Sequence, residues 1–324
     1  MEKRFESKVV GCLVGGAVGD ALGAPFEGLW AETIPEKDEL LAGYALYEGF
    51  PTGQYTDDTQ LTLATVESIL RCRSLNPADI ARSIFSLWRT EGVIGPGGAC
   101  SQAARRYFAT PDWTTCGAPP GNAGNGAAMR TAILGLCYSK TPQVLVPGVT
   151  DISLITHQDA RSIAGGVAIA QAAFLLLRDD KPDPFEFCHL VAESIRPIEP
   201  DFSQYLCALP EWVGRKASVA MEQIAWAGMR YPEFHQPIIT PFVIPTVLAA
   251  LWCVLRHPCH WEEAVAAAIQ LGGDVDTLGA IVGGLMGARL GITAIPTHLV
   301  AQLVQRDRIR NLGLALAQWI ETGC

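Results

Sequence analysis

Apolar residues recur along much of this chain at the three- and four-residue spacing that places them on one side of a helix. Leu61, Ala64 and Ile69 follow this spacing after a short polar segment and predict one such helix. The same spacing predicts further apolar helices over residues 163–177, 243–255, 262–269, 278–290 and 297–309. Alternation of the strand type does not recur, and no regular repeat is visible. The sequence therefore predicts an all-α fold.

Glycine and proline gather between residues 92 and 126, and this stretch is predicted to be a long irregular segment at the surface. Long loops in a compact protein are often functional. No other stretch has the composition of a linker between domains. We therefore expect residues 1–324 to form a single compact domain of many helices.

The overall composition narrows the classes of partner. With 49% hydrophobic residues, a chain of 324 residues can bury a large core. The net charge of −9 and the lack of a basic run argue against nucleic acid as a partner. The mean hydropathy of +0.21 is high, yet the most apolar run, residues 242–255, is shorter than the ~20 residues of a membrane span. No stretch is therefore expected to qualify as a membrane span.

Cysteine usage and the first residues bear on the cellular location. The ten cysteines are scattered without a Cys-x-x-Cys pair, which is typical of reduced thiols in a cytoplasmic protein. Residues 1–8 carry charges of both signs and lack the pattern of a signal peptide. We expect a cytoplasmic protein.

Two short acidic segments, far apart in the sequence, are the main candidates for chemistry. One reads Thr-Asp-Asp-Thr at 56–59 and the other Asp-Val-Asp-Thr at 274–277, and each opens directly into an apolar stretch. Carboxylate and hydroxyl oxygens are the ligands that hard divalent cations such as Mg²⁺ or Mn²⁺ prefer. If the segments meet in the fold, they form a two-metal site that can activate water and hold a diol. The alternative is ordinary capping of two helices by threonine and aspartate.

A glycine-rich apolar stretch over residues 11–23 predicts a helix that packs closely on a neighbour. It carries Asp20, and a turn through Pro25 leads from it to Glu27. A carboxylate among apolar residues is costly to bury without partners. We therefore expect Asp20 to orient a residue of the site.

Two further features have both a structural and a functional interpretation. The run Gly-Asn-Ala-Gly-Asn-Gly at 121–126 leads into an apolar helix. A glycine-rich turn that opens a helix presents backbone N–H groups to a phosphate, although this run lacks the Lys and Ser/Thr of a Walker loop. The second feature is His157, which follows Thr156 shortly before a predicted helix. A lone histidine is more often structural than catalytic, so both interpretations stay open.

Taken in order, these motifs resemble the ADP-ribosylglycohydrolase family. The matching segments are Gly-Asp-Ala-Leu-Gly at 19–23 with Glu27, Thr-Asp-Asp-Thr at 56–59, Gly-Asn-Gly-Ala-Ala-Met-Arg at 124–130, Thr-His at 156–157 and Gly-Gly-Asp-Val-Asp-Thr at 272–277. Five motifs in the expected order cover most of the chain and are highly specific. The resemblance implies an all-α enzyme that hydrolyses the bond between ADP-ribose and an acceptor.

The resemblance also implies roles for individual residues. Two Mg²⁺ or Mn²⁺ ions would lie between the acidic segments, with six ligands: Thr56, Asp57, Asp58, Asp274, Asp276 and Thr277. Catalysis would fall to Glu27, on a mobile loop, together with Asp58 and Asp276. ADP-ribose would contact four residues, mainly through its diphosphate and distal ribose: Gly124, Asn125, Gly126 and His157.

One segment departs from the family pattern. Many bacterial members of the arginine type carry an Asp in an Asp-Ile-Gly-like segment. Here the best match is Gly-Val-Ile-Gly at 92–95, with Val93 at the position of that Asp and Glu91 out of register. The base is then Glu27 or a metal-activated water, and the case for arginine-linked substrates weakens.

We therefore expect metal-assisted hydrolysis of an N- or O-glycosidic bond between ADP-ribose and a protein side chain or small conjugate. One alternative is a catalytically degenerate member of the family that binds ADP-ribose without turnover. Another is a hydrolase of a different ribosyl or nucleotide conjugate. The sequence does not choose between Mg²⁺ and Mn²⁺, and it does not name the acceptor.

Overall fold

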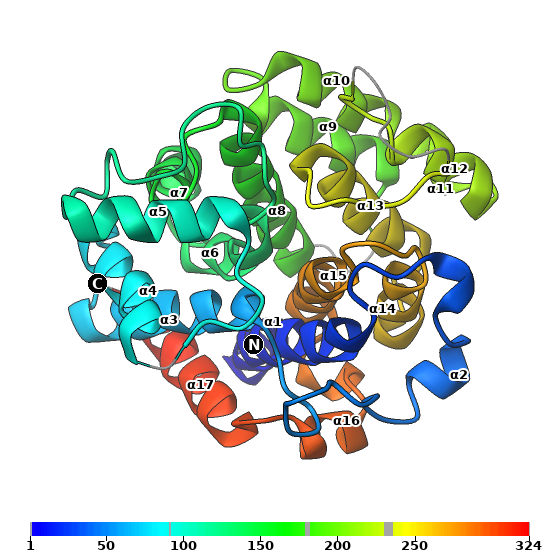
Figure 1. The fold of residues 1–324 in the computed structure, drawn as a ribbon, viewed down its shortest axis with the longest axis horizontal. Helices are drawn as coiled ribbons and strands as arrows, with labels where there is room; N and C mark the ends of the chain where they lie inside the picture. The colour runs from blue at the N-terminus through cyan, green and yellow to red at the C-terminus, as the bar shows by residue number, and fades with distance from the viewer. Residues whose placement is uncertain (1, 91, 179–181, 230–235, 324) are drawn as a thin grey trace.

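A computed structural model describes residues 2–90, 92–178, 182–229 and 236–323 of the chain. In these residues the regular secondary structure is helical, and β-type pairing is limited to isolated bridges. Figure 1 shows the helices packed around a central group that contains α1 and α15. The prediction of an all-α fold is confirmed.

The α-helices are α1 (Glu2–Gly23), α2 (Lys37–Leu40), α3 (Asp57–Cys72), α4 (Pro77–Thr90), α5 (Gly98–Ala109), α6 (Ala132–Cys137), α7 (Leu145–Leu154), α8 (Ala160–Arg178), α9 (Pro184–Ile195), α10 (Pro200–Ala208), α11 (Pro210–Val213), α12 (Ala217–Ile224), α13 (Val243–Arg256), α14 (Trp261–Ile269), α15 (Val275–Leu290), α16 (Thr297–Gln302) and α17 (Arg306–Thr322). Short 3-10 helices are η1 (Ala24–Phe26), η2 (Ala31–Thr33), η3 (Ala128–Arg130), η4 (Pro142–Val144) and η5 (Ile292–Ala294).

The first helix and a helix near the end of the chain form the closest contact in the core. α1 and α15 run antiparallel, and their backbones touch through glycines on both helices. A Cβ atom on Gly19 would lie 2.0 Å from the carbonyl oxygen of Gly279. Gly11 and Gly15 face α15 in the same way. The expectation of close packing by this glycine-rich helix is confirmed, and the contact places Asp20 of α1 near the N-terminus of α15.

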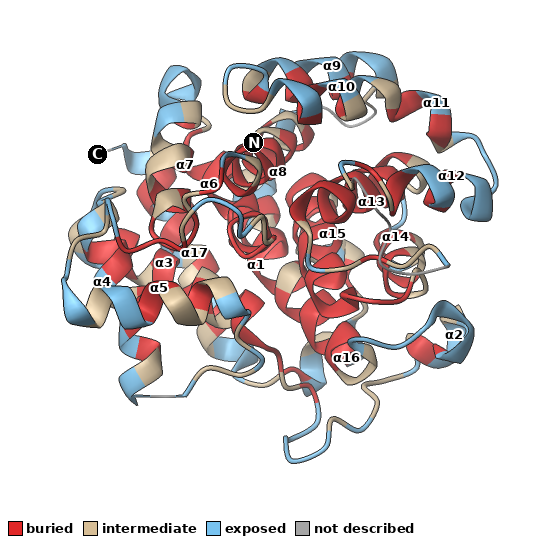
Figure 2. Ribbon diagram, turned by 45° about the horizontal axis from the view of Figure 1, so that its top comes forward, coloured by how far each residue is buried: buried red, intermediate tan, exposed pale blue. Residues whose placement is uncertain are grey.

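Burial follows this arrangement. Figure 2 shows α1, α13, α14 and α15 largely buried, while α2, α9 and α12 expose much of their outer surface. Two helical stretches, Lys3–Phe26 and Ala160–Arg178, are long and apolar enough to cross a membrane by length and composition. The expectation that no stretch would qualify is therefore wrong. In the fold, 83% and 78% of their most apolar windows are buried, because other helices surround them on most sides.

The predicted helix over 297–309 is interrupted. α16 ends at Gln302 and α17 begins at Arg306. Between them the chain pairs with a distant loop, where the N–H of Val304 donates to the carbonyl of Gly53 at 3.1 Å. This tertiary hydrogen bond replaces one that a continuous helix would have made.

The stretch 92–126 is also more ordered than predicted. Its middle forms α5, which buries Cys100, Ala103 and Ala104 against the core. Small apolar residues on one face are enough for a helix here because packing supplies most of the stability of a short helix.

Candidate active site

The two acidic segments meet at one cleft. Asp57 and Asp58 occupy the first turn of α3, and Asp276 occupies the first turn of α15, just after Asp274. Both pairs line the cleft, and the hydroxyl of Thr277 donates to Oδ2 of Asp58 at 3.4 Å. The convergence expected from the sequence is therefore present.

Capping does not explain these side chains. Thr56 and Asp274 stand at the N-cap positions of α3 and α15, and neither side chain makes a capping hydrogen bond. The cap of α3 comes instead from α1: Asp20 accepts from the N–H groups of Thr56 and Thr59 at 2.9 and 3.0 Å. It also accepts from both hydroxyl groups, at 2.9 and 2.6 Å. The expectation that Asp20 orients residues of the site is confirmed.

Thr56 lies behind the cleft. Its side chain is fully buried, and its hydroxyl is within hydrogen-bond distance of Asp20 and, at 3.3 Å, of Oδ2 of Asp58. Of the six expected metal ligands, the other five line the cleft: Asp57, Asp58, Asp274, Asp276 and Thr277.

The cluster carries an excess of negative charge. Burial, followed by the neighbouring carboxylates, raises the pKa values of Asp57, Asp58 and Asp276 well above the usual range. The buried cation nearby is Arg130, whose guanidinium donates to the carbonyl groups of Gly126 and Ile152 rather than to a carboxylate. Repulsion within the cluster is therefore not balanced by a salt bridge to Arg130.

The donor set fits divalent cations. Glu27, Asp274 and Asp276 each present a carboxylate oxygen, and these oxygens lie within 4.8 Å of one another. Oδ1 of Asp58 is buried without a hydrogen-bond partner, which is costly for a carboxylate unless a cation or water completes it. Oxygen-only ligands of this kind suit Mg²⁺ or Mn²⁺ rather than a soft metal.

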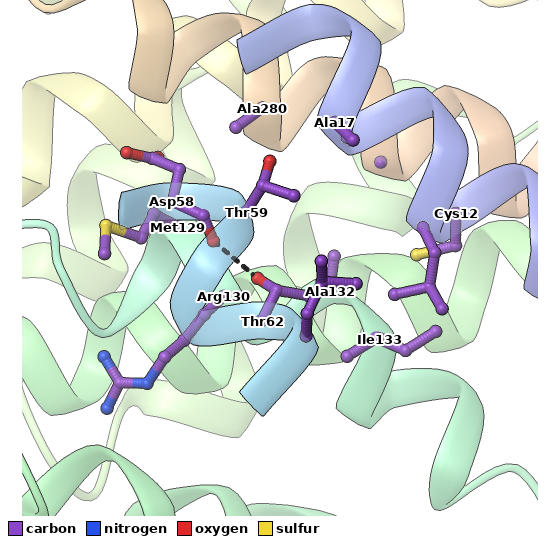
Figure 3. A pocket seen from close by; sticks show the side chains of 14 residues that line it. Cys12, Ala17, Asp58, Thr59, Thr62, Met129, Arg130, Ala132, Ile133 and Ala280 are labelled. Atoms are coloured by element: carbon purple, nitrogen blue, oxygen red, sulfur yellow. Dashed lines mark hydrogen bonds between the residues drawn. The ribbon is translucent and has the colours of Figure 1, made fainter. Parts of the chain in front are cut away.

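A small pocket of about 30 Å³ lies behind the cluster, where α1, α3, α15 and residues 129–133 meet. Figure 3 shows Asp58 and Met129 toward one side of it and Cys12 and Ile133 toward the other. The dashed line in Figure 3 joins Asp58 to Thr62, whose hydroxyl donates to the Asp58 carbonyl at 2.8 Å. This volume is close to that of one water molecule, so the back wall of the cluster is incompletely packed.

The glycine-rich loop forms another wall of the same cleft. Gly124, Asn125 and Gly126 line it together with His157. The segment before α13 holds the loop in place, because the N–H of Asn125 donates to the carbonyl of Pro241 at 3.0 Å. The structure thus brings together the residues that the resemblance assigned to ADP-ribose and those assigned to the metals.

His157 is an uncharged member of this wall. Burial, assisted by Arg130, lowers its pKa to about 3. Its Nδ1 atom is 2.9 Å from the hydroxyl of Thr156. The ring is therefore neutral near pH 7, and it acts through hydrogen bonding and shape rather than through charge.

The side chain of Asn125 has partners that the sequence did not reveal. Its amide nitrogen donates to Oδ2 of Asp274 and, at 3.0 Å, to the hydroxyl of Thr246 on α13. A polar Thr246 within the otherwise apolar helix 243–255 was the available signal. Cys100 and Met129 also line the cleft without having been predicted.

The segment 92–95, which departs from the family pattern, contributes one residue to the border of the cleft. Val93 is half-buried and packs against the hydrophobic core. The residue of this segment that borders the cleft is Gly95, which has a φ of +68°. A Cβ atom on Gly95 would lie 4.0 Å from Oδ1 of Asp57. Glu91 lies outside the described residues. Val93, which stands at the position of the family's Asp, does not line the cleft, and Gly95 brings no carboxylate to it.

An all-helical fold whose carboxylates converge from two helix N-termini beside a glycine-rich loop is an arrangement suited to a hydrolase. Comparison with known proteins gives the particular family. The chain belongs to the ADP-ribosylglycohydrolase family, whose model matches residues 1–323. It is accordingly an enzyme that hydrolyses glycosidic bonds to ADP-ribose.

Named relatives and a solved structure agree with this family. The chain is 26% identical to the ADP-ribosyl-[dinitrogen reductase] glycohydrolase of Rhodospirillum rubrum, covering 96% of each protein. It is 27% identical to the ADP-ribosylarginine hydrolase Tri1 of Serratia proteamaculans, covering 96% of this chain and 79% of that protein. A solved structure of an ADP-ribosylglycohydrolase-related protein complex superposes with a TM-score of 0.74 at 30% identity, covering 98% of this chain and 99% of that one.

Proposed function

We propose that this enzyme releases ADP-ribose from an acceptor in a reaction that requires two divalent cations, Mg²⁺ or Mn²⁺. The observation that carries the proposal is the convergence of four aspartates from α3 and α15 on one cleft, with Oδ1 of Asp58 left without a partner. A carboxylate cluster of this kind stays ionised at neutral pH only if cations compensate its charge.

Each part of the cleft then has a role. Six residues would hold the cations, five of them lining the cleft and Thr56 lying behind it: Thr56, Asp57, Asp58, Asp274, Asp276 and Thr277. When bound, they lower the pKa of water and stabilise charge that develops at the ribose. Gly124, Gly126 and His157 form the wall that holds the ADP-ribose. Asn125 belongs to the same wall, with its amide also engaged with Asp274.

Glu27 is the proposed general base. As a whole residue it is exposed at the edge of the cleft, but its carboxyl group is partly desolvated there, and this desolvation, together with Asp274 and Asp20, raises its pKa. A raised pKa makes a carboxylate a stronger base for water near neutral pH. Glu27 takes a proton from water as the water oxygen bonds to the anomeric carbon and the C–N or C–O bond to the acceptor breaks. The departing acceptor atom takes up a proton from solvent and Glu27 afterwards releases its proton to solvent, so one water is consumed in each turnover.

The acceptor remains open to experiment. The Serratia relative is named for arginine and the Rhodospirillum relative for dinitrogen reductase. The segment 92–95 of this chain adds no carboxylate to the cleft, which favours an acceptor other than arginine. We therefore test several linkages rather than one.

The experiment is a panel of arginine-, serine- and O-acetyl-linked ADP-ribose, incubated with Mg²⁺, with Mn²⁺ and with a chelator. We expect free ADP-ribose from at least one linkage, and only with a cation present. Glu27→Gln should lower turnover by roughly 10²–10⁴-fold with little change in ADP-ribose affinity. Crystals soaked in Mn²⁺ should show two anomalous peaks about 3.5–4 Å apart.

Three outcomes would overturn parts of the proposal. Cation-dependent ADP-ribose binding without turnover on any linkage would favour the degenerate binding protein. Turnover in the chelator would remove the metal requirement. Full activity of Glu27→Gln would exclude Glu27 as the base.

A further inference from the structure

Asn125 is almost fully buried between the glycine-rich loop and the N-terminus of α15. Both hydrogens of its amide nitrogen have acceptors, Oδ2 of Asp274 and the hydroxyl of Thr246. Both N–H groups of this amide therefore donate to acceptors within the protein. A residue that serves only to contact substrate would not need both bonds.

The orientation of this amide is fixed by its neighbours. The hydroxyl of Thr246 is 3.0 Å from the carbonyl of Phe242 and 3.3 Å from that of Thr240, so its single proton is donated to the backbone. Its oxygen can then only accept from Asn125. The nitrogen and not the oxygen of the amide must therefore face Thr246, and the same nitrogen is within hydrogen-bond distance of Oδ2 of Asp274.

Asp274 is held from two directions. Its backbone N–H donates to the carbonyl of Ile239 at 2.8 Å, and its Oδ2 accepts from Asn125. One carboxylate oxygen is thereby committed, which sets the direction in which the other one points. Residues 239–246 and the glycine-rich loop thus act together on one expected metal ligand.

We propose that Asn125 is a positioning residue: it fixes the orientation of Asp274 and so raises the affinity of the cluster for divalent cations. This inference rests on the proposed metal site. Hydrogen bonds to ligating side chains orient them, and removing such a partner typically lowers metal affinity about 10–100-fold. Because Asn125 belongs to the glycine-rich loop, it links the wall for ADP-ribose to the metal cluster.

The test measures Mn²⁺ binding alone, by calorimetry and by the electron paramagnetic resonance of free Mn²⁺, without nucleotide. Asn125→Leu keeps the shape of the side chain but has no donor, and Asn125→Ala removes it. Both should bind Mn²⁺ about 10–100-fold more weakly than the wild type. Thermal unfolding of each metal-free variant shows whether it is folded.

Thr246 provides a matched pair of variants that leaves Asn125 in place. Thr246→Val keeps the shape but leaves one amide hydrogen without an acceptor, so it should also weaken Mn²⁺ binding. Thr246→Ser keeps the hydroxyl and should bind Mn²⁺ like the wild type. This pair decides the question if the Asn125 variants do not fold.

The outcomes separate this inference from the proposed function. A wild-type protein that binds no Mn²⁺ would refute the proposed metal site itself. A wild type that binds Mn²⁺, with unchanged affinity in the Asn125 variants or in Thr246→Val, would overturn the positioning role alone. Unchanged Mn²⁺ affinity with weaker ADP-ribose binding in Asn125→Leu would make Asn125 a substrate contact instead.

Discussion

Two glycines of α1, three residues apart, should respond in opposite ways to the same substitution. Gly19 faces α15, where a Cβ would lie 2.0 Å from the carbonyl oxygen of Gly279 and 2.5 Å from its carbonyl carbon. A Cβ on Gly16 would lie 3.3 Å from its nearest neighbour, the carbonyl oxygen of Ala280. Gly16 also borders the small pocket of about 30 Å³.

These distances set the expected free energies. Alanine is favoured over glycine inside a helix by roughly 0.5–1 kcal/mol, and both variants gain this. Gly16→Ala needs a shift of only a few tenths of an ångström, so it should be neutral or slightly stabilising. Gly19→Ala must move two backbones apart by about 1 Å, and overpacking of this kind costs typically 1–3 kcal/mol or more. The net change for Gly19→Ala is therefore destabilising.

The assay is thermal unfolding of both variants without metal, followed by Mn²⁺ titration. Gly19→Ala should unfold at a lower temperature than the wild type, by up to a few degrees per kcal/mol. It should also bind Mn²⁺ more weakly, because a shift of α1 also displaces the next residue, Asp20, whose hydrogen bonds cap α3. Gly16→Ala should match the wild type in both. Equal stability and equal Mn²⁺ affinity of the two variants would refute the steric argument.

Two further predictions concern charge. Asp276→Asn relieves repulsion in the metal-free cluster. Its melting temperature without metal at pH 8 should therefore equal or exceed that of the wild type, and added Mn²⁺ should no longer raise it. A clear loss of metal-free stability would contradict this prediction. His157 has a pKa lowered to about 3, so below pH 6.5 the unfolded state binds a proton that the folded state does not, and stability from this residue falls by roughly 1.4 kcal/mol per pH unit. His157→Gln should lose less stability than the wild type between pH 6.5 and 4 in denaturant titrations, and parallel curves would show that the ring is protonated in the fold.

Local patterns in the sequence predicted most of the helices, because the spacing of apolar residues depends on which side of a single helix is buried. The apolar run 243–255 and α13 agree to within a residue. The sequence also predicted that the two acidic segments meet in one site. Their oxygen-rich composition at two helix starts has few structural explanations, and the family motifs assign both segments to the same site. Asp20 was identifiable for a similar reason, since a carboxylate in an apolar helix needs partners.

What the sequence did not predict depends on contacts between distant segments. The bond from Asn125 to Asp274 joins residues 149 positions apart, and neither residue type indicates the other. The interruption between α16 and α17 follows from a bond to Gly53, which no local propensity records. The sequence also did not show that Val93 packs against the hydrophobic core while Gly95, with a φ of +68°, borders the cleft.

The pairing of α1 with α15 has a consequence for how the chain is made. α15 leaves the ribosome about 260 residues after α1, which at 5–20 residues per second is roughly 10–50 s later. During that time α1, with a hydropathy of 1.6 over its most apolar window, has no α15 to cover its glycine face. Asp20 likewise has no finished α3–α15 cleft to organise. α1 is thus synthesised long before its packing partner and reaches its final environment late, so the active site can form only after α15 has been translated.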